Sequence, residues 1–359
     1  MLAAIRHKVL SGTRLTEADA LALFRSDDLF AIGRLASHVA EKQNGRHACF
    51  IVNRHINPTN ICVNRCKFCA FSRSKGEEGA FELTLEEILA KLADASKAKP
   101  RITEVHIVGG LHPEWPFEHY LDMISAVRKN HPSLAIKAFT AVEIDYMAKI
   151  SGLGIEDILR ELKKSGLDFM PGGGAEIFAE GIRNRLCPEK ISGDRWIEVM
   201  EAAHRTGIKT NATMLYGHQE GIEDRVEHLL RLRELQDRTG GFQAFIPLAY
   251  HPKNTEIGGF YSSGIDDLKT IAVSRLVLDN FPHIKAYWIM LGEKVSQTAL
   301  LFGADDVDGT IIEEKITHMA GAMTGEGMTR DDLVHLIRKA GKIPVERDAF
   351  YNHLKVYDY

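Results

Sequence analysis

Short runs rich in Val, Ile and Phe alternate with longer amphipathic stretches along most of the chain, and this alternation constrains the fold more than any other feature. A strand followed by a helix, repeated many times, indicates a parallel sheet covered by helices. Seven such units, with an eighth near 300–309, predict an α/β fold of the (β/α)8 TIM-barrel type, which takes about 250 residues. A doubly wound open sheet is the alternative, and the number of units favours the barrel. The expected strands lie within residues 48–57, 102–110, 135–143, 167–176, 208–217, 241–250 and 284–292, and the clearest helices within 84–97, 116–130, 155–166, 193–207, 223–237 and 266–280.

The chain divides into three expected segments. Residues 1–45 are expected to be helical, with Thr16 as the cap residue before a run of acidic and apolar residues. Residues 46–309 form the predicted barrel, and residues 310–359 are expected to be a helical extension packed on it. Polar residues and glycines follow most of the predicted strands. In a barrel these positions meet at one rim, where active sites lie.

Composition narrows the class of protein. The chain has 359 residues, 45% hydrophobic and 26% charged, which is the balance of a water-soluble globular protein. Its net charge of −4, without a basic cluster, argues against nucleic acid as a partner. We expect no membrane span, because no apolar run is long enough, and no secretory signal at the N-terminus. The five cysteines are an odd number, so we expect free thiols and a reducing, cytoplasmic location.

Three cysteines stand together directly after the first predicted strand. Cys62, Cys66 and Cys69 have the spacing C-x3-C-x2-C in NPTNICVNRCKFCAFSR. Thiolates so close together suit a soft metal or an iron–sulfur cluster. Structural zinc is the alternative, but it usually takes four ligands, and no fourth cysteine or suitably spaced histidine lies nearby. Cys49 and Cys187 are expected to be buried thiols without a role.

The motif, together with Phe68 before its last cysteine, resembles the radical S-adenosylmethionine superfamily. The resemblance implies a [4Fe–4S] cluster held by Cys62, Cys66 and Cys69, with one iron open to bind S-adenosylmethionine through its amino and carboxylate groups. It also implies an external electron donor such as flavodoxin or ferredoxin. One electron from the reduced cluster would cleave the sulfonium and release a 5′-deoxyadenosyl radical.

Other residues at predicted strand ends are candidates to bind S-adenosylmethionine. Gly109 and Gly110 end the second strand, where the family commonly places a glycine pair, although a simple turn would also use glycine. Thr140 and Glu143 could hold the ribose or the amino group, or could equally form a helix capping box. Glu176 follows PGGG, a turn that would clear space for adenosine or substrate.

The chain resembles the menaquinone and deazaflavin branch of the superfamily, and this resemblance covers nearly its whole length. The motifs KAFTAVEI, PGGGAEIF and YHPKNT are most similar to the aminofutalosine synthases. This implies a transferase that adds the 5′-deoxyadenosyl radical to 3-[(1-carboxyvinyl)oxy]benzoate and gives 6-amino-6-deoxyfutalosine, methionine and bicarbonate. S-Adenosylmethionine would then be consumed as a co-substrate.

Three alternatives remain open from the sequence. Two are sister enzymes, the cyclic dehypoxanthine futalosine synthase and the FO synthase type. The third is a zinc-stabilised binding or scaffold protein. The aromatic enol ether dicarboxylate needs donor groups and an apolar slot. The strand ends offer six candidates for these contacts, namely His112, Arg183, Tyr216, His218, His251 and Trp288.

Overall fold

The computed structural model describes residues 2–97, 101–311, 314–325 and 327–358. Residues 1, 312, 313, 326 and 359 of the predicted terminal segments, and residues 98–100 of the predicted barrel, therefore lie outside the described residues. The strands are β1 (His47–Ile51), β2 (Asn53–Ile56), β3 (Glu104–Ile107), β4 (Ala135–Ala138), β5 (Phe169–Met170), β6 (Lys209–Tyr216), β7 (Phe242–Ala249), β8 (His283–Ile284), β9 (Asp306–Gly309), β10 (Ile343–Arg347) and β11 (His353–Val356).

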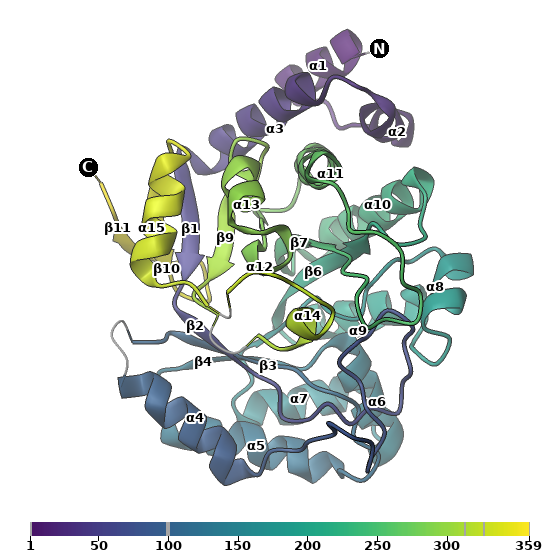
Figure 1. Cartoon of the computed structure of the whole chain (residues 1–359), viewed down its shortest axis with the longest axis vertical. Coiled ribbons are helices and arrows are strands. Elements are labelled where there is room, and N and C mark those ends of the chain that lie inside the picture. The colour runs from purple at the N-terminus through teal and green to yellow at the C-terminus, as the bar shows by residue number, and fades with distance from the viewer. Residues whose placement is uncertain (1, 98–100, 312–313, 326, 359) are drawn as a thin grey trace.

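A curled parallel sheet forms the centre of the molecule (Figure 1). It contains β2 to β8 in chain order, each paired in parallel with the next. A parallel bridge between Lys285 and Asp306 links β8 to β9, and β9 pairs with β1. Only Val52 separates β1 from β2, so the ring of strands that begins at β2 closes through β9 and β1. The predicted α/β fold of TIM-barrel type is confirmed.

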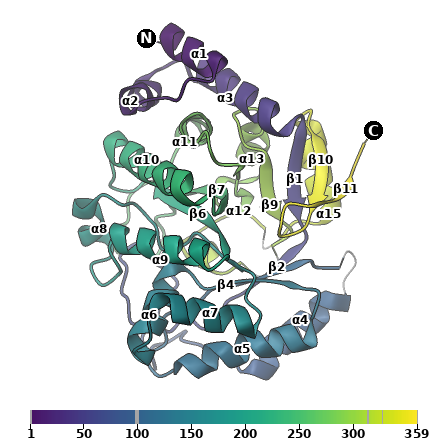
Figure 2. The same ribbon diagram turned by 180° about the vertical axis from the view of Figure 1, so that it is seen from behind.

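Helices surround the sheet. They are α1 (Leu2–Ser11), α2 (Glu17–Arg25), α3 (Leu29–Asn44), α4 (Leu85–Lys97), α5 (Phe117–Asn130), α6 (Ala141–Ser151), α7 (Ile155–Ser165), α8 (Glu180–Leu186), α9 (Gly193–Arg205), α10 (Ile222–Thr239), α11 (Gly264–Val277), α12 (Trp288–Leu291), α13 (Glu293–Ala299), α14 (Ile316–Met319) and α15 (Arg330–Lys339). The contacts α4–α5, α5–α7, α7–α9, α9–α10 and α10–α11 build an outer layer that Figure 2 shows from behind. Helix α7 illustrates how this layer packs, because Ile158, Leu159 and Leu162 form an apolar face that is buried.

The N-terminal segment is helical, as expected. Thr16 caps α2 and forms a capping box with Asp19. Helix α3 packs against α11, and α2 packs against α10 and α11. The segment thus extends the helical layer at one end of the molecule (Figure 1). Among the described residues, no helix is both long and apolar enough to cross a membrane.

Two expectations about secondary structure need correction. The tail is not helical throughout, because β10 pairs in parallel with β1 and β11 pairs with β10 in antiparallel. The expected strand at 284–292 ends after Ile284, and α12 follows, with Trp288, Ile289 and Leu291 buried. A short apolar run fits a buried strand and a buried helical turn equally well, so periodicity alone did not separate them.

Candidate active site

The three cysteines of the motif lie in the loop that follows β2, and all three line one cavity of about 330 Å³. The loop is held at its base, where Cys62 N donates to Arg73 O at 3.0 Å and Cys69 N donates to Cys66 O at 2.9 Å. Burial raises the pKa of the Cys62 and Cys69 thiols. Thiols that are costly to ionise alone suit a cationic metal centre, which stabilises the thiolate.

The number of cysteines at the cavity suits a cluster. Structural zinc usually takes four protein ligands, whereas a [4Fe–4S] cluster held by Cys62, Cys66 and Cys69 would bind one thiolate on each of three irons. Buried Cys187 hydrogen-bonds with Cys66, which raises the pKa of Cys66, but it is not among the cavity-lining residues.

The glycine pair joins the end of β3 to the start of the cysteine loop. Gly110 N donates to Thr59 O at 2.9 Å. A Cβ atom on Gly110 would lie 2.7 Å from the carbonyl carbon of Ile61 and 3.0 Å from Cys62 Cβ. Both glycines also line the cavity. Because Gly110 has no side chain, the cysteine loop can lie this close to the end of β3.

Thr140 and Glu143 form the capping box of α6 and line the cavity as well. Thr140 N donates to Glu143 Oε2 at 2.7 Å, and Gly109 N donates to Glu143 Oε1 at 3.2 Å. Burial raises the pKa of Glu143 to about 7, against the opposing effect of these donors. The carboxylate thus ties the end of β3 to the start of α6.

Glu176 faces the cavity beside a lysine that sequence reasoning missed. Lys190 Nζ lies 2.6 Å from Glu176 Oε1 and 5.1 Å from the ring centre of Phe68. Burial alone would raise the pKa of Glu176, but the Lys190 ammonium keeps it below its usual value. Both residues and Phe68 line the cavity with the cysteines. Lys190 follows the short helix α8, with no motif around it to mark it.

Arg183 does not line the cavity. Its buried guanidinium donates to the carbonyl oxygens of Gly174, Ala175, Ile177 and Ile191, at 2.6 to 3.3 Å. Gly174, Ala175 and Ile177 lie in the loop after β5, and Ile191 lies in the loop after α8. Arg183 satisfies their carbonyls, which have no strand or helix partner. Its contacts therefore shape the glycine turn.

Four more predicted substrate contacts have other partners and do not line the cavity. His112 pairs with Glu82 at 2.9 Å, and Tyr216 donates to Asp267 at 2.8 Å. His218 pairs with Glu220 at 3.0 Å, and Trp288 donates to Gly309 O at 2.9 Å. Of the six candidates, only His251 lines the cavity, where its Nε2 lies 3.0 Å from Met290 O.

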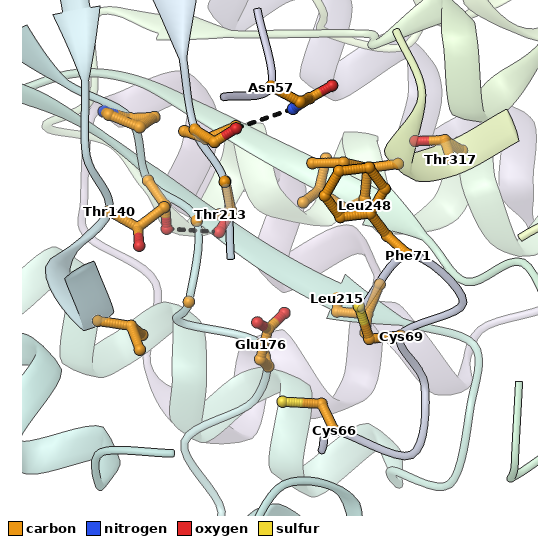
Figure 3. Close-up of a pocket in the computed structure, with 18 of the residues that line it drawn as sticks. Asn57, Cys66, Cys69, Phe71, Thr140, Glu176, Thr213, Leu215, Leu248 and Thr317 are labelled. Carbon is orange, nitrogen blue, oxygen red and sulfur yellow. Dashed lines mark hydrogen bonds between the residues drawn. The ribbon is translucent and has the colours of Figure 1, made fainter. Parts of the chain in front are cut away.

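Figure 3 shows the cavity between two ends, with Cys66 and Glu176 at one and Asn57 and Thr317 at the other. Apolar side chains form the wall between them, including Phe71, Leu215 and Leu248. Such a wall suits an aromatic ring or an adenine.

Polar residues that the sequence did not single out line the cavity further inside the sheet. His55, His106, Lys137 and Asp308 come from β2, β3, β4 and β9. They stand within predicted strands rather than after them. The signal was their alternation with apolar neighbours, since alternate residues of a barrel strand point inward.

The segment 314–320 lies over the cavity from the C-terminal part of the chain. Ile316, Thr317 and Ala320 line the cavity. Asn254 donates to Met319 O at 2.8 Å, which ties this segment to the loop after β7. The site is thus completed by a region far along the chain from the cysteines.

Comparisons with known proteins agree with this geometry. Residues 56–232 match the Radical SAM superfamily, and residues 239–358 match the CofH/MqnC C-terminal region. The chain is 46% identical to the aminodeoxyfutalosine synthase of Thermus thermophilus, over 99% of this chain and 96% of the relative. It is 43% identical to a 5-amino-6-(D-ribitylamino)uracil–L-tyrosine 4-hydroxyphenyl transferase of Methanopyrus kandleri, over 92% and 90%.

The chain is also similar to a third type of relative and to solved structures. It is 38% identical to the cyclic dehypoxanthine futalosine synthase of Streptomyces coelicolor, over 99% of this chain and 89% of the relative. The crystal structure of methylornithine synthase superposes with a TM-score of 0.76 at 18% identity, over 95% and 97% of the two chains. At that identity the structural likeness concerns the fold alone.

Proposed function

The chain belongs to the radical S-adenosylmethionine superfamily, in the branch with the CofH/MqnC C-terminal region, and on this basis we propose that it is an aminodeoxyfutalosine synthase of menaquinone biosynthesis. Enzymes of this superfamily use a [4Fe–4S] cluster and S-adenosylmethionine. The proposed reaction joins the adenosyl group to 3-[(1-carboxyvinyl)oxy]benzoate and gives 6-amino-6-deoxyfutalosine, methionine and bicarbonate. Full-length identity of 46% to the Thermus synthase carries the proposal.

Cys62, Cys66 and Cys69 are the residues that would hold the cluster. When bound and reduced, the cluster supplies the electron that cleaves S-adenosylmethionine and yields a carbon-centred radical. The Lys190 ammonium beside Glu176 places a positive charge near the thiolates. We include a flavodoxin or ferredoxin as electron donor in the proposal.

The cavity residues have the chemistry that the proposed substrate requires. Its benzoate ring needs an apolar wall, which Phe71, Leu215 and Leu248 supply. Glu143 and the glycine pair fix the relative positions of the cysteine loop, β3 and α6. Since radical addition requires the reacting carbons to be about 3–3.5 Å apart, rigid support of this kind is a condition for turnover.

A product assay tests the proposal. Anaerobically reconstituted protein would receive a reductant, S-adenosylmethionine and the enol ether benzoate, and the products would be separated by liquid chromatography and mass spectrometry. We expect an adduct that contains adenosine, with little free 5′-deoxyadenosine. If free 5′-deoxyadenosine accumulates in step with substrate loss, the synthase assignment is wrong.

The sister activities are the second candidates, because identity to the tyrosine transferase is 43% and to the cyclase 38%. Parallel reactions with dehypoxanthine futalosine, and with tyrosine plus 5-amino-6-(D-ribitylamino)uracil, separate them from the synthase. The zinc-stabilised scaffold alternative loses its basis, because the chain belongs to an enzyme superfamily whose cysteine motif binds iron and sulfur.

A further inference from the structure

Three nitrogen-bearing side chains stand in a row across neighbouring strands inside the sheet. His55 of β2 is the register partner of His106 of β3, and His106 is the partner of Lys137 of β4. All three line the cavity. Residues in register on adjacent strands point to the same face, so the row is built by the sheet itself. We call His55, His106 and Lys137 the inner row.

The two imidazoles of the inner row have unused hydrogen-bonding capacity. The rings meet edge to face, with centres 4.5 Å apart. Nε2 of His55 and Nε2 of His106 are buried and have no hydrogen-bond partner among the described residues. Residue His55 as a whole is only 7% exposed. A buried polar atom without a partner is destabilising, so two of them side by side in a cavity indicate a ligand that accepts hydrogen bonds.

The charges around the inner row are already compensated. Lys137 pairs with Glu104 at 2.6 Å, and Lys285 pairs with Asp308 at 2.7 Å. Glu314, which also lines the cavity, lies 3.1 Å from His318. Neither carboxylate of the first two pairs needs the histidines as partners. The imidazole nitrogens remain free to donate to an incoming anionic group.

The inner row lies deeper in the cavity than the cysteine loop. The cysteine loop follows the end of β2, whereas His55 precedes that end and shares its face with Asn57. Figure 3 shows Asn57 at the end of the cavity opposite Cys66. A ligand that reaches from the cysteines to the inner row must therefore pass the apolar wall of Phe71, Leu215 and Leu248.

We propose that Nε2 of His55 and Nε2 of His106 bind the ring carboxylate of the substrate and so orient its vinyl group toward the cysteine end. This inference rests on the proposed function, because the carboxylate is that of the enol ether benzoate. It assigns the ring to the apolar wall and the ring carboxylate to the inner row. None of the strand-end residues expected from the sequence takes this role.

Binding measurements with two ligands test the proposal on the cluster-loaded enzyme. The first ligand is the enol ether benzoate, and the second is 2-phenoxyacrylate, which lacks only the ring carboxylate. We expect the wild-type enzyme to bind the first roughly 10- to 100-fold more tightly, as the loss of hydrogen bonds to a charged group implies. Titration calorimetry gives both dissociation constants without turnover.

The variants are His55→Phe and His106→Phe, which keep an aromatic ring but donate no hydrogen bond. Each should weaken binding of the benzoate roughly 10-fold or more and leave binding of 2-phenoxyacrylate nearly unchanged. His55→Gln and His106→Gln place a donor near the Nε2 position and should recover part of the preference. His119→Gln, on α5 outside the cavity, is the control and should behave as wild type.

The outcomes separate the two proposals. If the Phe and Gln variants all keep the wild-type preference for the carboxylated ligand, the inner row does not bind the carboxylate. If the Phe variants do not fold, His55→Leu and His106→Leu, which also donate no hydrogen bond, decide in the same way. If the wild-type enzyme shows the expected preference and the Phe variants lose it, but the enzyme does not convert the benzoate, the proposed function fails while the binding assignment stands.

Discussion

Replacing Gly110 with alanine should displace the cysteine loop. The added Cβ atom would lie 2.7 Å from the carbonyl carbon of Ile61, closer still to its oxygen, and 3.0 Å from Cys62 Cβ. Carbon atoms in good contact are about 3.5 Å apart, so the loop must move by roughly 0.8 Å or more. Both obstructing groups of Ile61 belong to the backbone, which cannot rotate away as a side chain could.

Two further glycines give a graded series. A Cβ atom on Gly109 would lie 2.9 Å from Thr59 O and needs a smaller movement of the same loop. A Cβ atom on Gly181, inside α8, would meet nothing within 4 Å, so Gly181→Ala is the control. At Gly109 and Gly110 the added methyl group overpacks the site, which costs about 1–3 kcal/mol of folding free energy. Gly181→Ala should be neutral or stabilising by about 0.5–1 kcal/mol, because it removes a helix glycine.

Activity should respond more strongly than stability. A displacement near 1 Å at a reacting centre can reduce turnover by about 100-fold. We therefore expect Gly110→Ala to lose about 100-fold in turnover, Gly109→Ala to lose less and Gly181→Ala to lose nothing. The assays are iron content after anaerobic reconstitution, thermal unfolding and the rate of adduct formation. A folded Gly110→Ala enzyme with normal iron content and normal turnover would refute the reasoning about the loop.

Further predictions concern the ligands, the buried ion pairs and the pH dependence. Cys66→Ala should abolish cluster absorption after reconstitution, whereas Cys187→Ala should retain it, because Cys187 does not line the cavity; loss of the cluster in both would make Cys187 a ligand. Asp306→Asn should lower the free energy of unfolding by about 3–5 kcal/mol, since it leaves the buried Arg347 guanidinium without its 2.7 Å carboxylate partner, and a change below about 1 kcal/mol in denaturant titration would contradict this. Burial raises the pKa of Glu143 from 4.5 to about 7, because the folded protein favours the protonated carboxyl group. The stability that this group contributes is therefore fully present below pH 4.5 and is lost as the pH rises through about 7. This amounts to about 3 kcal/mol at about 1.4 kcal/mol per pKa unit, and Glu143→Gln should remove that pH dependence from the unfolding curves of the cluster-free protein.

The fold was largely predictable because the barrel repeats one local pattern. Each predicted strand is followed by a buried helix face, and the pairing of β2 to β8 in chain order needs no long-range information. The pairing of β10 with β1 could not be predicted in this way. It joins residues 47–51 to 343–347, and the short run at 343–347 contains Pro344, which weakens the local strand signal.

The cysteines were identifiable because one short loop carries the whole motif. The substrate contacts expected at strand ends were harder to predict, since the direction of a side chain after a strand depends on the turn that follows. Arg183 of α8 shows this, because its guanidinium donates to backbone carbonyls of the loop that precedes the helix. His55 and His106 show the reverse, because they were read as parts of apolar runs although the sheet directs them into the cavity.

The central claim is that this chain transfers the adenosyl carbon of S-adenosylmethionine into its product. The most direct test uses S-adenosylmethionine labelled with ¹³C at the 5′ carbon, in a single anaerobic reaction with the enol ether benzoate. We predict that carbon NMR and mass spectrometry find the label in an adduct that also contains the benzoate ring. Recovery of the label in free 5′-deoxyadenosine, with none in a benzoate adduct, would contradict the account.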